Sequence, residues 1–104
     1  MIAPGTYCAK PRRLALPLVR LSPDHDPEPI YPERVAHYRE LLDAHPEHDI
    51  GIIMVTPDPR APGLYTILDG RHRYLASRAA QRADILAVIL IAPDQPEYAD
   101  FGAA

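Results

Sequence analysis

The sequence has a single cysteine, no tryptophan and no long apolar run. Because Cys8 has no second cysteine to pair with, an internal disulfide is excluded, and a reducing, cytoplasmic location is expected. The longest apolar run covers residues 85–92 and is far shorter than the roughly 20 residues of a membrane-spanning helix. The N-terminus also lacks the apolar segment of a secretory signal. These absences predict a protein without a membrane partner.

An excess of positive charge is also missing. The 14 Asp and Glu residues outnumber the 11 Lys and Arg residues, and the net charge is −3. A negatively charged protein does not attract nucleic acid over its whole surface, so any affinity for phosphate must come from a local group of side chains. The 104 residues are enough for one small domain.

Prolines are abundant but unevenly placed. The chain has 13 of them, and none lies between Gly63 and Ala92. Because proline interrupts both helices and strands, this interval is the part best able to form continuous secondary structure. The composition predicts three segments and a loop: a flexible basic arm over residues 1–13, one domain over 14–92 with a proline-rich loop at 22–32, and a C-terminal tail over 93–104.

Hydrophobic spacing predicts an α+β fold built on a small mixed sheet with packed helices. Apolar residues recur at helical spacing over residues 33–44, where Pro32 and Glu33 suit the first turn. A second helix is predicted over residues 70–82. Four mainly apolar strands complete the pattern, at residues 14–21, 51–56, 64–68 and 85–91. The order is β-α-β-β-α-β, and the short link between the middle strands predicts a hairpin.

The stretch ILDGRHRYLAS, residues 67–77, places nitrogen-rich side chains at the start of the second helix. The backbone there carries about half a positive charge from the helix dipole and presents free N–H groups. Gly70 allows a ligand to approach the backbone closely, and Arg71, His72 and Arg73 add further donors. This combination predicts a phosphate-binding site. The same residues also fit a surface helix capped by Asp69, whose arginines only contact solvent.

Residues 65–76, YTILDGRHRYLA, resemble the signature of the ParB/sulfiredoxin superfamily. Members have a strand ending in Asp-Gly or Gly-Gly, a short His/Arg-rich motif, a helix and then an apolar strand. The similarity extends over about residues 16–91, because the opening strand, the first helix and the strand at 52–55 also match. This resemblance implies a ParB/sulfiredoxin-like fold and nucleotide-phosphate chemistry.

Individual members of the superfamily differ in the motif. Aligned on the sulfiredoxin motif G-G-C-H-R, His72 and Arg73 match the phosphate ligands, and Arg71 stands at the position of the catalytic cysteine, which argues against sulfiredoxin activity. Aligned on the ParB motif G-E-R-R of a CTP-binding domain, Gly70 and Arg73 match. The motif D-G-R-H-R is most similar to the D-G-H-x-R motif of an ADP-dependent serine kinase and of ParB-like nucleases.

The first helix offers two more candidates. Arg34 and His37 are three residues apart and therefore share a helix face. The resemblance implies that this helix contributes to the nucleotide site, as it does in sulfiredoxins. The alternative is a solvated face opposite Val35 and Tyr38.

Two function classes are consistent with this pattern. The first is an enzyme that binds a nucleoside di- or triphosphate with Mg²⁺ and hydrolyses or transfers a phosphoryl group, or a nuclease. In it, Asp69 holds the metal or acts as a base, and Arg71 and Arg73 stabilise charge on the phosphate. The second is a binding module for a nucleotide, DNA or RNA that acts through a protein partner or as a homodimer. There the basic arm and the helix arginines form one stripe.

Overall fold

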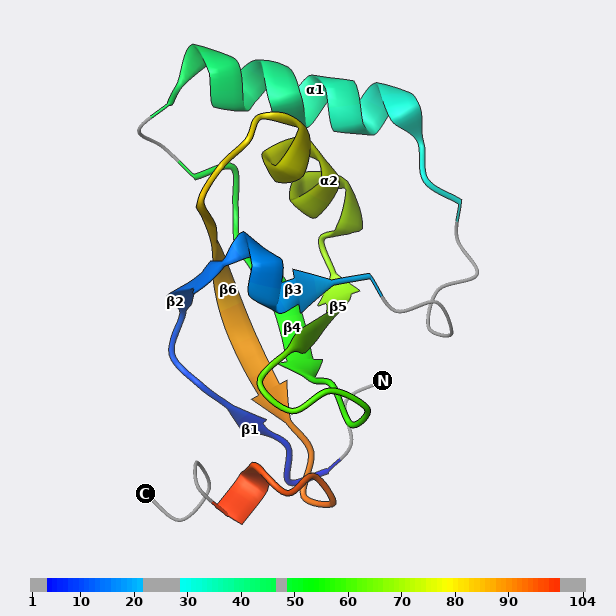
Figure 1. The fold of residues 1–104 in the computed structure, drawn as a ribbon, viewed down its shortest axis with the longest axis vertical. Helices are drawn as coiled ribbons and strands as arrows, with labels where there is room; N and C mark the ends of the chain where they lie inside the picture. Colours follow the sequence, from blue (N-terminus) through cyan, green and yellow to red (C-terminus); the bar gives the residue numbers. More distant parts are fainter. Residues whose placement is uncertain (1–3, 22–28, 47–48, 100–104) are drawn as a thin grey trace.

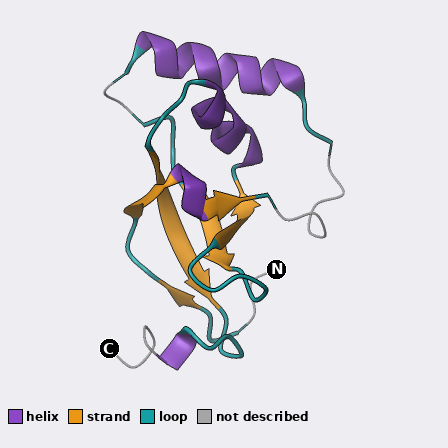
Figure 2. Cartoon of the chain, in the orientation of Figure 1, coloured by secondary structure: helices purple, strands orange, loops and turns teal. Residues whose placement is uncertain are grey.

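The computed structural model describes residues 4–21, 29–46 and 49–99. A mixed sheet carries two α-helices at one end, as Figures 1 and 2 show. The helices are α1 (Pro32–Ala44) and α2 (Arg71–Ala79). The strands are β1 (Tyr7–Cys8), β2 (Arg12–Ala15), β3 (Val19–Arg20), β4 (Ile53–Pro57), β5 (Tyr65–Asp69) and β6 (Asp84–Ile91). The α+β class, the mixed sheet and the helix start at Pro32 are confirmed.

The sheet runs in the order β1-β6-β4-β5-β3, and β2 also pairs with β6. β4 and β5 form the expected antiparallel hairpin, with Val55 opposite Ile67. β4 lies parallel to β6, with Met54 opposite Val88, and β3 lies parallel to β5. The central strands therefore bring the end of β5, where the Asp-Gly pair lies, to the middle of the sheet beside β4.

The first expected strand, residues 14–21, is wrong as one continuous element. Residues 16–18 form a short 3-10 helix, η1, between β2 and β3. Pro17 explains the break, because proline has no N–H to donate to a strand ladder. β2 pairs with β6 and β3 pairs with β5, so the chain crosses from one side of β4 to the other. Residues 7–8 and 12–13, which were expected in a flexible arm, pair instead with β6.

The second helix ends at Ala79 instead of the expected Arg82. Gln81 adopts a left-handed conformation with φ 56°, and the Arg82 N–H donates to the Ser77 carbonyl oxygen at 2.9 Å. This is the geometry of a Schellman helix end, which glycine usually provides. Because glutamine carries no such signal, the sequence pattern did not reveal the stop.

Alternating side chains of β4 and β6 build the core. Ile53, Val55, Ile89 and Ile91 are completely buried, as the strand period of two requires. Tyr74 of α2 is also buried, and its hydroxyl donates to the Val19 carbonyl oxygen at 3.0 Å. This contact packs α2 onto the sheet.

α1 packs against α2 and not against the sheet (Figure 1). Leu42 is the one completely buried α1 residue among those described. The far end of α1 is held by Arg82, whose Nη2 donates to the carbonyl oxygens of Leu42 at 3.2 Å and His45 at 3.4 Å. A cation at this position also favours the negative end of the helix dipole. Within the described part of the chain, no helix has the length and apolar character needed to cross a bilayer.

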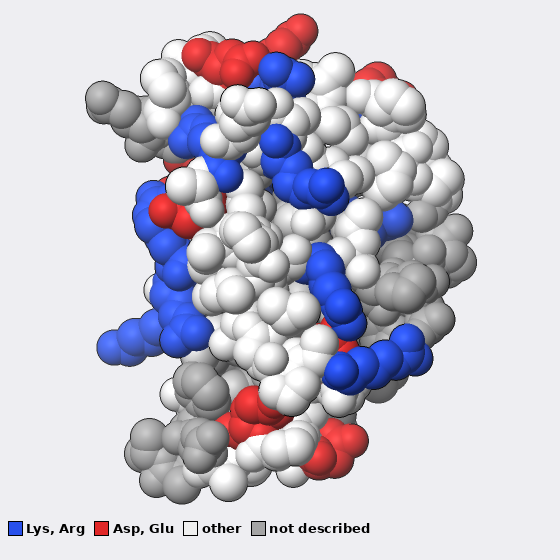
Figure 3. All heavy atoms as spheres, in the orientation of Figure 1, with Lys and Arg blue, Asp and Glu red and all other residues white. Residues whose placement is uncertain are grey.

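The arginines near the N-terminus have neighbouring partners. Arg13 pairs with Asp49 at 2.8 Å and with Asp84 at 2.9 Å, so two carboxylates offset its charge. Arg12 donates from Nη2 to the Tyr65 hydroxyl at 3.2 Å. On the face shown in Figure 3, Lys and Arg side chains lie in separate groups with uncharged surface between them.

Gly70 joins β5 to α2 in a conformation that requires glycine. Its φ is 103°, and a Cβ at this position would lie 2.5 Å from Cγ2 of Ile53. The tight approach sets where α2 begins relative to β4, because the backbone of Gly70 lies directly against a completely buried side chain.

We predict that Gly70→Ala lowers the free energy of unfolding by about 2–5 kcal/mol, since left-handed strain and overpacking against Ile53 add together. Gly63→Ala is the matched control: Gly63 has φ 87°, but a Cβ there would meet nothing within 4 Å. Its expected loss is about 1–2 kcal/mol. Chemical denaturation measures both values, and equal losses would show that the Ile53 contact contributes nothing.

A buried carboxylate holds the turn between β4 and β5. Asp58 is only 4% exposed, and its Oδ1 accepts the Arg60 N–H at 2.8 Å. Its Oδ2 forms an ion pair with Arg20 of β3. The Arg60 N–H, together with Arg20, lowers the pKa of Asp58 below its ordinary value of 3.8, although burial opposes this shift.

We expect this carboxylate to stabilise the fold at neutral pH and to lose that effect in acid. Because its folded pKa is the lower one, the contribution is complete above 3.8 and disappears as the pH falls through the folded pKa. Denaturation of the wild type and of Asp58→Asn across this range isolates the effect from other carboxylates. The stability difference should be largest near neutrality and vanish at low pH; a constant difference would contradict the assignment.

Candidate anion-binding site

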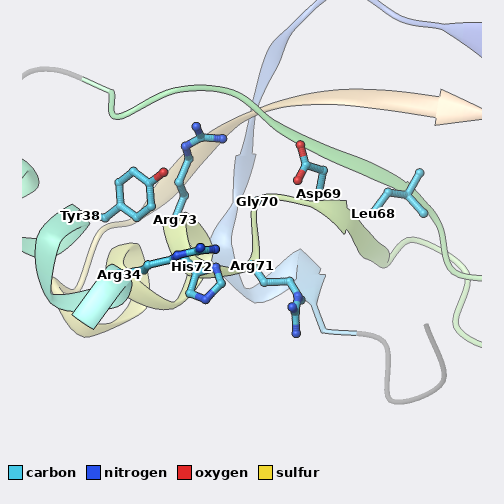
Figure 4. Close-up of a pocket in the computed structure, with 8 residues that line it drawn as sticks. All are labelled: Arg34, Tyr38, Leu68, Asp69, Gly70, Arg71, His72 and Arg73. Atoms are coloured by element: carbon cyan, nitrogen blue, oxygen red, sulfur yellow. The ribbon is translucent and has the colours of Figure 1, made fainter. Parts of the chain in front are cut away.

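The first turn of α2 opens into a hollow of about 320 Å³ (Figure 4). This size lies within the range of small-molecule sites. The lining consists of Arg34 and Tyr38 of α1 and the continuous run 68–73. Three arginines and one aspartate line it, so the hollow is locally positive in a chain whose net charge is −3.

The start of α2 has no side-chain cap. Gly70 is the N-cap residue, and no side chain accepts a hydrogen bond there. The expected capping by Asp69 is therefore wrong; Asp69 is instead the exposed last residue of β5. N–H groups in the first turn of a helix have no partner within the helix, and the dipole is positive at this end. An anion in the hollow would accept hydrogen bonds from these N–H groups and would be stabilised by the positive end of the dipole.

Arg73 is held by its neighbours. Its Cζ lies 5.3 Å from the centroid of the Tyr38 ring, and a Cβ on Gly51 would lie 3.0 Å from its Nε. The Nε–H is buried and has no hydrogen-bond partner among the residues that the structure describes. A buried donor without an acceptor is costly, so an oxygen ligand reaching Arg73 would relieve that cost.

α1 contributes Arg34 to the hollow but not His37. The Arg34 Cζ lies 4.8 Å from the centroid of the Tyr31 ring, just before the helix. His37 is exposed and lies 5.8 Å from Tyr38, ring centre to ring centre. Tyr38, which was not expected as a site residue, lines the hollow beside Arg34. Tyr38 is four residues from Arg34, and this spacing indicates that the two side chains share a helix face.

His72 faces the start of α1. Its Nε2 accepts the backbone N–H of Tyr31 at 3.0 Å, and the two rings stack with centroids 6.0 Å apart. An accepting Nε2 places the proton of a neutral imidazole on Nδ1. The Nε2 of His72 is therefore engaged with the backbone at the start of α1.

The remaining charged groups extend in different directions. In Figure 4, Asp69 and Arg73 extend toward the same side of the hollow, and Arg71 extends toward the opposite side. Gly70 lies between them. Leu68, which the sequence analysis did not single out, is 41% exposed at the edge of the hollow and adds apolar surface. The site thus combines a charged side with an apolar edge.

No protein-family model and no curated protein matches the sequence. Solved structures, however, share its architecture. The C-terminally truncated chromosome-partitioning protein ParB from Caulobacter crescentus, complexed with CTP-gamma-S, superposes with a TM-score of 0.71 at 19% identity, over 83% of this chain and 47% of that one.

The chain has the ParB/sulfiredoxin fold.

Two further structures agree. The same ParB complexed to the centromeric parS site gives a TM-score of 0.61 at 19% identity, covering 75% of this chain and 37% of that one. C-terminally truncated SbnI from Staphylococcus aureus gives a TM-score of 0.57 at 22% identity, covering 74% of this chain and 29% of that one. The chain thus spans less than half the length of each of these three structures. The fold implied by the D-G-R-H-R motif is confirmed.

Proposed function

We propose that this ParB-fold domain binds a nucleoside di- or triphosphate, with the phosphates at the first turn of α2. One observation carries the proposal: an uncapped helix N-terminus opens into a hollow lined by Arg34, Arg71 and Arg73. The ParB structure that contains a CTP analogue has the same fold and so supports a nucleotide as the ligand.

The physical basis is a division between fixed and adjustable donors. Backbone N–H groups of residues 71–73 are fixed by the helix and suit the non-bridging phosphate oxygens. Arg73 approaches from beside Tyr38, and Arg34 approaches from α1. Guanidinium groups form paired hydrogen bonds with phosphate, so the two arginines select for this anion. Leu68 provides apolar surface for the less polar part of the nucleotide.

Among the described residues, Asp69 is the one carboxylate that lines the hollow, and it is the candidate Mg²⁺ ligand. Among the described residues, no three His, Cys, Asp or Glu side chains gather into a metal site. This suits Mg²⁺, which is commonly held by one or two carboxylates together with phosphate oxygens and water. Bound there, the ion would neutralise phosphate charge for hydrolysis or transfer. Arg73, with Arg71 from the other side, would stabilise the charge that develops.

A second function is favoured by a different observation. A ParB of this fold has been solved on its DNA site, and the present chain carries separate groups of cations besides the hollow. The alternative is a non-catalytic module that binds DNA or RNA and acts through a protein partner or a homodimer. Nucleic-acid binding weakens steeply with salt, by about one log-log unit per phosphate contact. A discrete nucleotide site depends instead on Mg²⁺ and on the base.

We predict that Arg73→Ala weakens nucleotide binding by about 1.5–3 kcal/mol, the contribution of hydrogen bonds to a charged group. Calorimetry with CTP, ATP and GTP, with and without Mg²⁺, measures the change. Arg39→Ala is the control for the loss of an arginine, because Arg39 is exposed on α1, pairs with Asp43 at 3.8 Å and does not line the hollow. Equal affinity in both variants would remove Arg73 from the site.

We further predict that Asp69→Asn abolishes nucleotide turnover and the Mg²⁺ dependence of binding while metal-free binding persists. The reason is that the amide retains the size of Asp69 and loses the charge that attracts the metal. Phosphate release and calorimetry report the two effects separately. Full turnover in Asp69→Asn would rule out the metal or base role, and absence of turnover in the wild type would favour the binding module.

A further inference from the structure

α1 packs against α2 and is also held by polar contacts at its two ends. Its C-terminal end is held through Arg82, and its start is held through the bond from the Tyr31 N–H to His72. Among the described α1 residues, Leu42 is the one whose side chain is buried, and it lies near the C-terminal end. A helix with so little apolar burial depends on such polar contacts for its position.

The His72 contact is connected directly to the hollow. Tyr31 is the N-cap residue of α1, and its N–H is held at 3.0 Å from Nε2. The Tyr31 ring stacks on the His72 ring and also lies 4.8 Å from Arg34 Cζ. One turn further along α1, Tyr38 contacts Arg73. The position of the α1 start therefore decides where Arg34 and Tyr38 lie.

We propose that His72 is a positioning residue: as a hydrogen-bond acceptor it fixes the start of α1, so that Arg34 and Tyr38 line the anion hollow. This inference rests on the proposed function and deepens it. It also gives Tyr31, which lies outside the sequence motif, the role of hydrogen-bond donor to His72. It adds a role for His72, because its Nε2 accepts from the Tyr31 N–H and is therefore not the nitrogen that can donate to a phosphate.

Three substitutions of His72 separate the two roles. His72→Ala removes both functions. His72→Gln keeps an acceptor oxygen near the position of Nε2, whereas His72→Lys keeps a cationic donor and has no acceptor. Calorimetry is performed on the full chain with CTP and with inorganic triphosphate as probes. We expect His72→Ala and His72→Lys each to weaken binding about tenfold, and His72→Gln to stay within about threefold of the wild type.

The outcome that overturns the proposal is equally specific. Recovery of binding in His72→Lys would make His72 a direct phosphate ligand, and loss in His72→Gln equal to that in His72→Ala would overturn its role as an acceptor. Arg39→Ala again serves as a control for changes in surface charge, since Arg39 does not line the hollow.

Hydrogen exchange of the ligand-free protein supplies a second readout. We expect the first turn of α1, residues 32–36, to exchange faster in His72→Ala than in the wild type, with β6 unchanged and His72→Gln restored. Unchanged exchange in His72→Ala would overturn the positioning role. If the wild type binds neither CTP nor triphosphate, the proposed function fails, and exchange still tests the link between His72 and Tyr31.

Discussion

The close contact between Gly70 and Ile53 is the constraint on which the rest of the structure depends. It joins the end of β5 to the start of α2 with no space for a side chain, in a left-handed conformation. Since Ile53 is completely buried in the core, the first turn of α2 is held in a fixed place at the end of the sheet. Backbone donors can serve a ligand only when they are rigid, and this junction makes them so.

Charge is arranged locally and not over the whole molecule. The chain is acidic overall, and several cations are offset by carboxylates, such as Arg13 by Asp49 and Asp84. The arginines of the hollow lie beside the positive end of α2 instead. The shared fold with ParB and SbnI places this arrangement on a scaffold for which a nucleotide complex is known. α1, which has little apolar burial, brings part of the charge to the site.

Local sequence determined much of the architecture. Pro32 marks the start of α1 because a helix tolerates proline in its first turn. The short link between residues 57 and 65 allowed only a hairpin, and the apolar run of β6 required burial. The Asp-Gly pair located the start of α2 to within one residue. These features depend on backbone rules and on spacing between neighbours in the chain, which the sequence states directly.

The tertiary structure alone decided what those residues face. His72 accepts a hydrogen bond from Tyr31, 41 residues away, and Tyr38 rather than His37 reaches the hollow. Pro17 splits the first strand so that its halves pair on opposite sides of β4, and Gln81 ends α2 without a glycine. Apart from the local helix end at Gln81, each outcome depends on which distant groups come into contact. The sequence determined which donors and acceptors are available, and packing determined how they are paired.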